Sequence, residues 1–272
     1  MPRTPQSMAS AKTKARTAPP ITPASDYARL SQQPWTSLVF IAPMLVLYEV
    51  GVLALGSVAT RNGADVWLRT LLDLIGIGQY FLLPLLVCGI LLAWHYLTRQ
   101  PWTIRPSVLG WMLIESLVLS WLLLLIAQTQ GALFGQISAA LTADMTASTG
   151  SGGALFSRMI GYLGAGIYEE LLFRLMLLPV VIAAIKACGF TSRTSVVAGI
   201  VLVSLVFSAA HYKLDFVLGP WHVVTPYGDV WSFYTFTFRF LAGVFFAVLF
   251  QLRGFGIAAG AHALYDISVA LL

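Results

Sequence analysis

Charged residues are scarce in this chain of 272 residues: Asp, Glu, Lys and Arg make up 10% of it, whereas 58% is hydrophobic. A soluble domain carries roughly 25% charged residues, so this composition does not provide a water-soluble surface. A cytosolic enzyme, a secreted domain and a nucleic-acid-binding protein are therefore excluded. The mean hydropathy of +0.82 predicts a multi-pass integral membrane protein, whose surroundings are membrane lipid.

Cysteine is nearly absent, with two residues in the whole chain. Two isolated cysteines, Cys88 and Cys188, form neither a disulfide framework nor a cysteine-based zinc cluster. Disulfide-stapled and zinc-finger folds are therefore excluded.

The basic excess is confined to the N-terminus. Residues 1–33 contain five Lys or Arg and one acid, whereas 11 cations and 10 anions make the rest of the chain nearly neutral. The sequence pI of about 9.4 therefore describes the tail and does not indicate nucleic acid as a partner. Residues 1–33 also contain several prolines and no apolar run, so we expect a disordered basic tail. A cleaved transit peptide fits the same composition.

Apolar segments of about 20 residues, the length that a bilayer core requires, follow one another from residue 35 onward. A longer apolar stretch, 154–188, contains Pro179 and forms either one kinked helix or two shorter ones. The sequence therefore predicts an all-α, polytopic membrane helix bundle of about seven transmembrane helices, or eight if this stretch divides. The other six predicted spans are 37–59, 79–97, 108–128, 194–212, 232–252 and 254–272.

Two further segments lie between these spans. The charges of residues 63–77 are spaced as in an interfacial amphipathic helix, and residues 129–153 read as a polar loop without Lys or Arg. The distribution of Lys and Arg favours a cytoplasmic N-terminus, and we expect a bacterial plasma membrane. The chain thus divides into a tail (1–33), an N-terminal membrane part (34–153) and a C-terminal membrane part (154–272).

Glutamate is also rare, and two of the four glutamates, Glu169 and Glu170, are adjacent in an apolar stretch. A charge inside a membrane span costs roughly 2.5–3.5 kcal/mol, so each needs a partner or a function. Arg174 follows Glu170 at the i,i+4 spacing of a helical ion pair. A purely structural pair explains Glu170 but leaves Glu169, about 100° away around the helix, without a partner. We therefore favour a functional role for the two carboxylates.

Of four histidines, two lie at informative positions. His211 ends one apolar run, and His262 lies within the last, one helical turn before Asp266. If the chain reverses between residues 186 and 193, Glu170 and His211 lie at nearly the same height along two adjacent helices, roughly 24 and 27 Å from the turn. His262 matches this level less well, at ~14 Å from the start of its helix.

A pair of glycines in the last predicted helix favours close packing of the helix that carries His262. Gly256 and Gly260 form a GxxxG pattern, which predicts that this helix approaches a neighbour closely.

Taken in order, these residues resemble the CAAX-protease and bacteriocin-processing (CPBP) family of intramembrane endopeptidases. That family has the pattern EExxxR, FxxxH and HxxxN or HxxxD on separate membrane helices. The resemblance covers about residues 154–272 and implies that they form a catalytic core. Two positions depart from the pattern: Leu175, where many members have Gly, and Asp266, where the prenyl-protein proteases have Asn. The matching residues here are Glu169, Glu170 and Arg174, then Phe207 and His211, then His262 and Asp266.

The resemblance implies an intramembrane endopeptidase that cleaves a membrane-associated or prenylated protein or peptide. Glu169 would be the general base that activates water, and His211 would orient it or share its proton. His262 and Asp266 would bind the scissile carbonyl and its oxyanion. An ionised Asp266 cannot donate a hydrogen bond, so we expect it to fix the tautomer and orientation of His262.

The remaining two motif residues are expected to support the site. Arg174 would pair with Glu170 and keep its helix in position, and Phe207 would pack against the neighbouring helices.

The cofactor is left open between two alternatives. The resemblance favours a glutamate-dependent mechanism without a cofactor, and no HExxH motif is present. Alternatively, Glu169, His211 and His262 are the ligands of a zinc ion that carries the attacking water.

Two other functions use the same residues. In a proton-coupled transporter, the buried Glu and His residues would form a relay. In a non-catalytic scaffold or immunity protein, they would only stabilise the fold.

Overall fold

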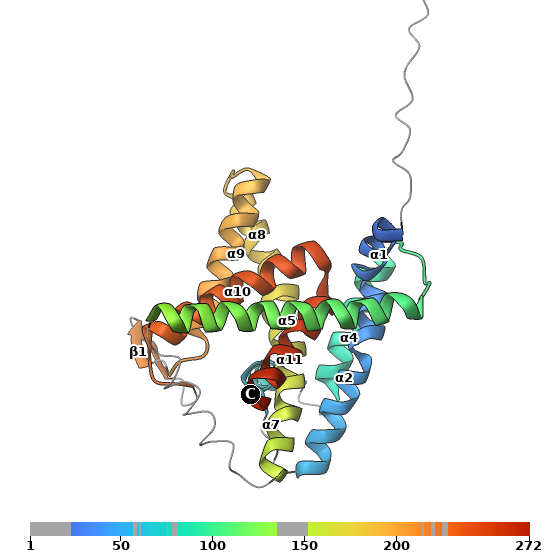
Figure 1. Ribbon diagram of the computed structural model, residues 1–272. Helices are drawn as coiled ribbons and strands as arrows, with labels where there is room; N and C mark the ends of the chain where they lie inside the picture. Colours follow the sequence, from blue (N-terminus) through green and yellow to red (C-terminus); the bar gives the residue numbers. More distant parts are fainter. Residues whose placement is uncertain are drawn as a thin grey trace, which may run out of the picture.

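The computed structural model describes residues 23–56, 59, 61–74, 76–77, 81–134, 152–213, 215–218, 221–224 and 228–272. Helices dominate this part of the chain, as predicted, and one short antiparallel hairpin pairs β1 with β2 (Figure 1). The strands are β1 (Asp215–Leu218) and β2 (Trp221–Val224). The helices are α1 (Pro23–Ser31), α2 (Pro34–Leu55), α3 (Gly63–Leu74), α4 (Leu82–Leu97), α5 (Pro106–Phe134), α7 (Gly152–Gly164), the π-helix η2 (Ala165–Leu177), α8 (Leu178–Ala187), α9 (Ser192–Ala209), α10 (Phe233–Arg253) and α11 (Phe255–Leu271).

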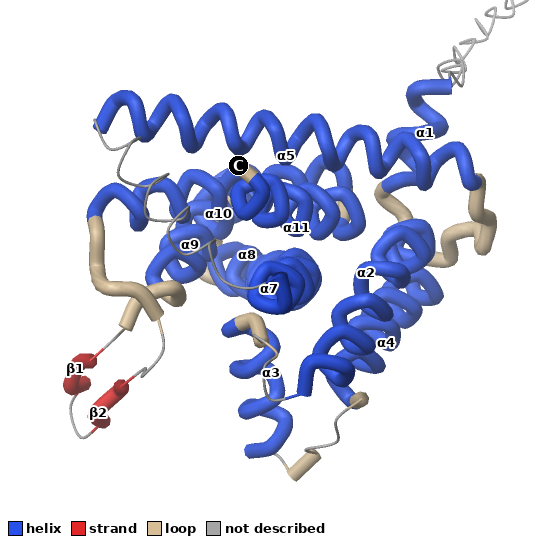
Figure 2. The backbone as a smooth tube through the Cα atoms, turned by 60° about the horizontal axis from the view of Figure 1, so that its bottom comes forward, coloured by secondary structure: helices blue, strands red, loops and turns tan. Residues whose placement is uncertain are grey.

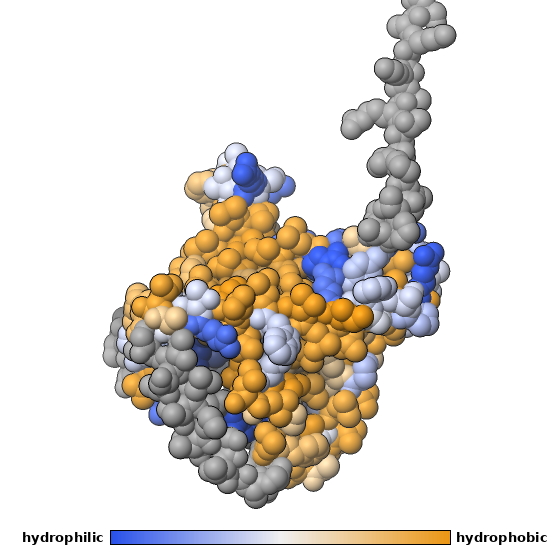
Figure 3. All heavy atoms as spheres, in the orientation of Figure 1, coloured by the Kyte–Doolittle hydropathy of each residue, from blue (hydrophilic) through white to orange (hydrophobic). Residues whose placement is uncertain are grey.

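Each predicted membrane span coincides with a helix or helical run. Helices α2, α5, α9 and α10 are long and apolar enough to cross a membrane, and α4 and α11 are shorter apolar helices. Apolar side chains dominate the face in Figure 3, with hydrophilic ones at the tip of the α8–α9 hairpin and around α1. The chain is an integral membrane protein. Figures 1 and 2 show α5 running across the direction of α2.

The apolar stretch around Pro179 forms one continuous helical run, residues 152–187, whose middle part is the π-helix η2. Proline has no N–H to donate, and it is tolerated in the first turn of an α-helix. Pro179 lies in the first turn of α8, where the π-helix ends and the α-helix resumes. The wider turn of η2 carries both glutamates, and π-helical turns frequently occur at functional sites.

The boundaries of two predicted segments are corrected. The disordered tail predicted over 1–33 is wrong for residues 23–31, which form α1. This helix is held in place because Leu30 is buried among apolar residues of α5 and α11 and because Tyr27 donates a hydrogen bond to Glu115. The polar loop predicted over 129–153 is wrong for residues 129–134, which continue α5, and for residues 152–153, which begin α7. The Gln130 side chain of α5 donates to the backbone oxygen of Tyr234. Residues 1–22 and 135–151 lie outside the described part.

Helix α3 coincides with the predicted amphipathic segment. It buries Ala64, Asp65 and Leu68 and exposes Leu71 and Leu74. The buried carboxylate of Asp65 accepts hydrogen bonds from the Tyr48 hydroxyl, Arg61 and Arg69. The contact with Tyr48, together with an ion pair between Arg69 and Glu49, joins α3 to α2. The position of α3 at a membrane surface stays a prediction.

Helix α11 lies at the centre of the bundle, and glycines let its neighbours approach it. A Cβ atom at Gly256 would lie 2.9 Å from the side chain of Met112, and one at Gly260 would lie 2.9 Å from Ser116 Oγ. These contacts with α5 confirm the close approach expected from GxxxG. On the other side, a Cβ atom at Gly166 of η2 would lie 2.6 Å from the backbone oxygen of Ala259. The η2 backbone therefore reaches α11 one turn before His262.

Candidate active site

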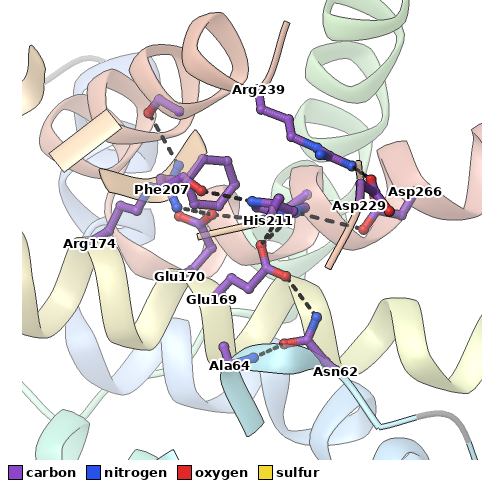
Figure 4. Close-up of polar contacts among 12 residues, drawn as sticks. Asn62, Ala64, Glu169, Glu170, Arg174, Phe207, His211, Asp229, Arg239 and Asp266 are labelled. Atoms are coloured by element: carbon purple, nitrogen blue, oxygen red, sulfur yellow. Dashed lines mark hydrogen bonds and ion pairs between the residues drawn. The ribbon is translucent and has the colours of Figure 1, made fainter. Parts of the chain in front are cut away.

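The two adjacent glutamates of η2 both face His262 on α11. Oε1 of Glu170 lies 2.8 Å from Nδ1 of His262, and Oε2 of Glu169 lies 3.8 Å from its Nε2. The imidazole ring therefore lies between the two carboxylates. Figure 4 shows Glu169 between Asn62 and His211. His262 was expected to lie at a different height from Glu170 and His211, but it lies beside the two glutamates. The reason is that α11 starts inside the bundle, where Phe255 to Ala263 are all buried.

The expected ion pair between Glu170 and Arg174 is present and completely buried. Arg174 Nη1 lies 3.3 Å from Oε1 of Glu170, and the two side chains are 1% and 0% exposed. Arg174 also donates to the backbone oxygen of Gly243 on α10, and its guanidinium lies 4.2 Å from the centre of the Phe207 ring. This pair joins η2, α9 and α10.

His211 follows the end of α9 and presents one nitrogen to Glu169. Its Nδ1 lies 2.7 Å from the backbone oxygen of Phe207, which can only accept, so Nδ1 carries the hydrogen. In the neutral ring Nε2 is then unprotonated, and it lies 3.8 Å from Oε2 of Glu169. The backbone oxygen of His211 accepts from the N–H of Asp229, which fixes this turn.

The phenylalanine of the second motif packs among the polar residues, as expected. Its ring makes edge-to-face contacts with Phe173, His211 and His262, at centroid distances of 5.1, 4.8 and 6.3 Å. Phe207 thus fills the space between α9, η2 and α11.

The carboxylate that holds His262 differs from the expected one. Oδ2 of Asp266 lies 3.7 Å from Nε2 of His262, which is beyond hydrogen-bond distance, whereas Glu170 makes a hydrogen bond of 2.8 Å to Nδ1. Helical i,i+4 spacing places Asp266 on the correct face, but Glu170 approaches the ring edge more directly.

Two residues near this cluster were not found by the sequence motifs. The side chain of Asn62, before α3, donates from Nδ2 to Oε1 of Glu169 at 2.7 Å. The ring of Phe246 on α10 stacks on His262 at 4.4 Å and 13°. Sequence alone gives no sign of either contact, because each depends on an element that comes close only in the folded chain.

A cavity of about 540 Å³ borders this cluster. Five of the predicted site residues line it: Glu169, Phe207, His211, His262 and Asp266. Glu170 and Arg174 are not among the lining residues, since they lie deeper in the bundle. Three arginines also line the cavity: Arg61, Arg158 and Arg239.

The set proposed for zinc does not form a ready metal site. Nε2 of His211 and Nε2 of His262 each lie 3.8 Å from the same carboxylate oxygen of Glu169. Across the described ranges, no three His, Cys, Asp or Glu side chains are arranged to hold a metal ion. The choice between the metal-free and the zinc mechanism stays a prediction.

Comparison with known proteins identifies one family. Residues 151–268 match the family model described as type II CAAX prenyl endopeptidase Rce1-like. This range contains all three motifs and excludes Asn62. No curated protein and no solved structure gives a significant match to the chain.

Proposed function

We propose that this chain, whose residues 151–268 belong to the Rce1-like family of type II CAAX prenyl endopeptidases, hydrolyses a peptide bond with a water molecule activated by Glu169. The family is one of intramembrane endopeptidases. What is proposed beyond the family is which residues carry out the reaction and which class of substrate is cleaved.

One observation carries this assignment: a single carboxylate oxygen faces two imidazole nitrogens at the cavity wall. Oε2 of Glu169 is buried without a hydrogen-bond partner among the described residues, and the Nε2 atoms of His211 and His262 each lie 3.8 Å away. Because Glu169 and His211 both line the cavity, the proposed attacking water lies beside this oxygen and the unprotonated Nε2 of His211. Such a carboxylate meets the geometric requirement for a general base.

In the proposed reaction, the water oxygen bonds to the carbonyl carbon of the scissile peptide and its proton passes to Glu169. The carbonyl oxygen becomes an oxyanion, and the bond from carbon to nitrogen then breaks. The proton held by Glu169, with His211 beside it, passes to the leaving amine. The products are a carboxylate and an amine, without any oxidant or further co-reactant.

His262 is the proposed donor to the oxyanion. Its Nδ1 faces Glu170 and its Nε2 faces Glu169 and Asp266, so carboxylates surround both nitrogens. When both ring nitrogens carry hydrogen, Nδ1 donates to Glu170 and Nε2–H remains free of a hydrogen-bond partner among the described residues. The Nε2–H, at the cavity wall, is then available to an oxyanion, where such a donor stabilises the transition state.

Glu170 and Arg174 are proposed to position the site instead of contacting the substrate. Both are absent from the cavity lining, and together they hold Nδ1 of His262. Asp266 lines the cavity and adds negative charge beside Nε2 of His262.

The proposed substrate is a membrane-associated or prenylated protein or peptide. The family model describes prenyl endopeptidases, and the cavity is lined by residues of the apolar helices α7, α9, α10 and α11. A substrate that is itself held in the membrane reaches such a site without leaving the bilayer.

The test is cleavage of prenylated and unprenylated membrane-tethered peptides by purified protein in proteoliposomes. Glu169→Gln keeps the side-chain shape and removes the base, so activity should fall by about 10²–10⁴-fold. Asp73→Asn, an exposed substitution on α3, is the matched control and should retain full activity. Equal cleavage by wild type and Glu169→Gln would overturn the proposal.

The same proteoliposomes address the two other functions. A transporter would show proton flux that Glu169→Gln abolishes, without cleavage of any peptide. A non-catalytic scaffold would show neither activity, and Glu169→Gln would change only its stability.

A further inference from the structure

Asn62 uses both ends of its side-chain amide. Nδ2 donates to Oε1 of Glu169 at 2.7 Å, and Oδ1 accepts from the backbone N–H of Ala64 at 2.8 Å. A backbone N–H can only donate, so the oxygen of the amide must face Ala64 and the NH₂ group must face Glu169. The donor to the carboxylate is thereby fixed.

The helix that follows Asn62 is held firmly in place. Asp65 is completely buried and accepts from Tyr48 at 2.8 Å, from Arg61 at 2.9 Å and from Arg69 at 2.6 Å. Asn62 lies three residues before this anchor, as the capping residue of α3. The position of its amide is therefore set by the docking of α3 on α2.

The contact also determines which oxygen of Glu169 faces the histidines. With Oε1 bonded to Asn62, the other oxygen, Oε2, lies 3.8 Å from the Nε2 atoms of both His211 and His262. The terminal torsion of a glutamate is otherwise broad, so the carboxylate would rotate without this anchor.

We propose that Asn62 is a positioning residue that holds the carboxylate of Glu169 in its reactive orientation. This inference rests on the proposed function of Glu169. It also adds an element from outside residues 151–268, the part of the chain that the family model covers. The N-terminal half of the chain thereby contributes to the site.

The competing explanation is that Asn62 only caps α3. Asn62→Ser separates the two roles, because the serine hydroxyl still accepts from the N–H of Ala64 as a helix cap, whereas its shorter side chain does not reach Glu169. Asn62→Ala removes both contacts. A capping role predicts that the serine variant behaves like wild type, and a positioning role predicts that it does not.

Steady-state cleavage of the membrane-tethered peptide provides the readout. Both variants should lose kcat on the order of 10²-fold, because a displaced reacting group costs about this much, while KM stays within about twofold. The unfolding temperature of Asn62→Ser should stay close to that of wild type, because the cap of α3 is kept. Thr70→Ala, on the exposed face of the same helix, should leave kcat unchanged. Wild-type kcat in Asn62→Ser would overturn the proposal.

Failure of the proposed function is recognised separately, because wild type and Glu169→Gln would then cleave equally. The contact itself is tested without a substrate, by thermal unfolding of Asn62→Ala, Glu169→Ala and the double variant. Residues that contact one another give non-additive effects. Additive changes would overturn the contact and, with it, the positioning role.

Discussion

Oε1 of Glu170 lies 2.8 Å from Nδ1 of His262, although 92 residues separate them in the chain. The same oxygen lies 3.3 Å from Arg174. One buried carboxylate thus links a structural ion pair to an imidazole at the cavity wall, while its neighbour Glu169 faces the cavity. The two adjacent glutamates thus differ in their contacts, and the roles proposed for them predict different consequences for their substitution.

Replacing Glu170 should affect stability more than replacing Glu169. Glu170→Ala leaves Arg174 as a buried, unpaired charge, and breaking such a pair costs about 3–5 kcal/mol of unfolding free energy. Glu169→Ala removes a carboxylate at the cavity wall and should cost less. Denaturant or thermal unfolding in detergent measures both values. Equal losses of stability would contradict the division.

Enlarging Gly166 should separate η2 from α11. In Gly166→Ala the new Cβ atom meets the backbone oxygen of Ala259 at 2.6 Å and the side chain of Ala263 at 2.7 Å. Overpacking of this kind costs about 1–3 kcal/mol, and the displaced helix should also weaken the contact between Glu170 and His262. We expect a lower unfolding temperature together with reduced cleavage.

The matched control is Gly89→Ala in α4, where a Cβ atom would meet nothing within 4 Å. This substitution should leave activity intact and stabilise the helix by up to about 1 kcal/mol. If Gly166→Ala behaved like Gly89→Ala, the close approach of η2 and α11 would not control the site.

Loss of the Asp65 carboxylate should loosen α3. Asp65→Asn weakens hydrogen bonds from two arginines and leaves an amide beside them, at a cost of about 1.5–3 kcal/mol. Because α3 carries Asn62, cleavage should fall as well. Asp73→Asn, on the exposed side of α3, serves as the control and should change neither unfolding nor cleavage. Hydrogen exchange of the α3 amides measures the loosening directly, and unchanged exchange would contradict it.

Chelators should leave the activity unchanged if glutamate acts without a metal. We expect cleavage to persist after treatment with a strong chelator, and we expect substoichiometric metal in the purified protein. Zinc at one equivalent, with activity that is lost on chelation and restored by zinc, would instead support Glu169, His211 and His262 as ligands.

The sequence alone determined the class of the protein and most of its site. Scarce charge and repeated apolar segments required a membrane helix bundle, because a bilayer excludes unpaired charge and demands long apolar helices. For the same reason the rare polar residues Glu169, His211 and His262 stood out, and they do meet at one cavity.

Only the tertiary structure decided which of these residues line the cavity and which lie deeper in the bundle. Asn62 and Phe246 join the site through contacts of α3 and α10, which no local pattern encodes. Glu170, and not Asp266, holds His262, because the glycine at 166 lets η2 approach α11 closely enough. Sequence spacing fixes the side of a helix on which a residue lies. Packing between helices decides which of the residues on that side come within hydrogen-bond distance.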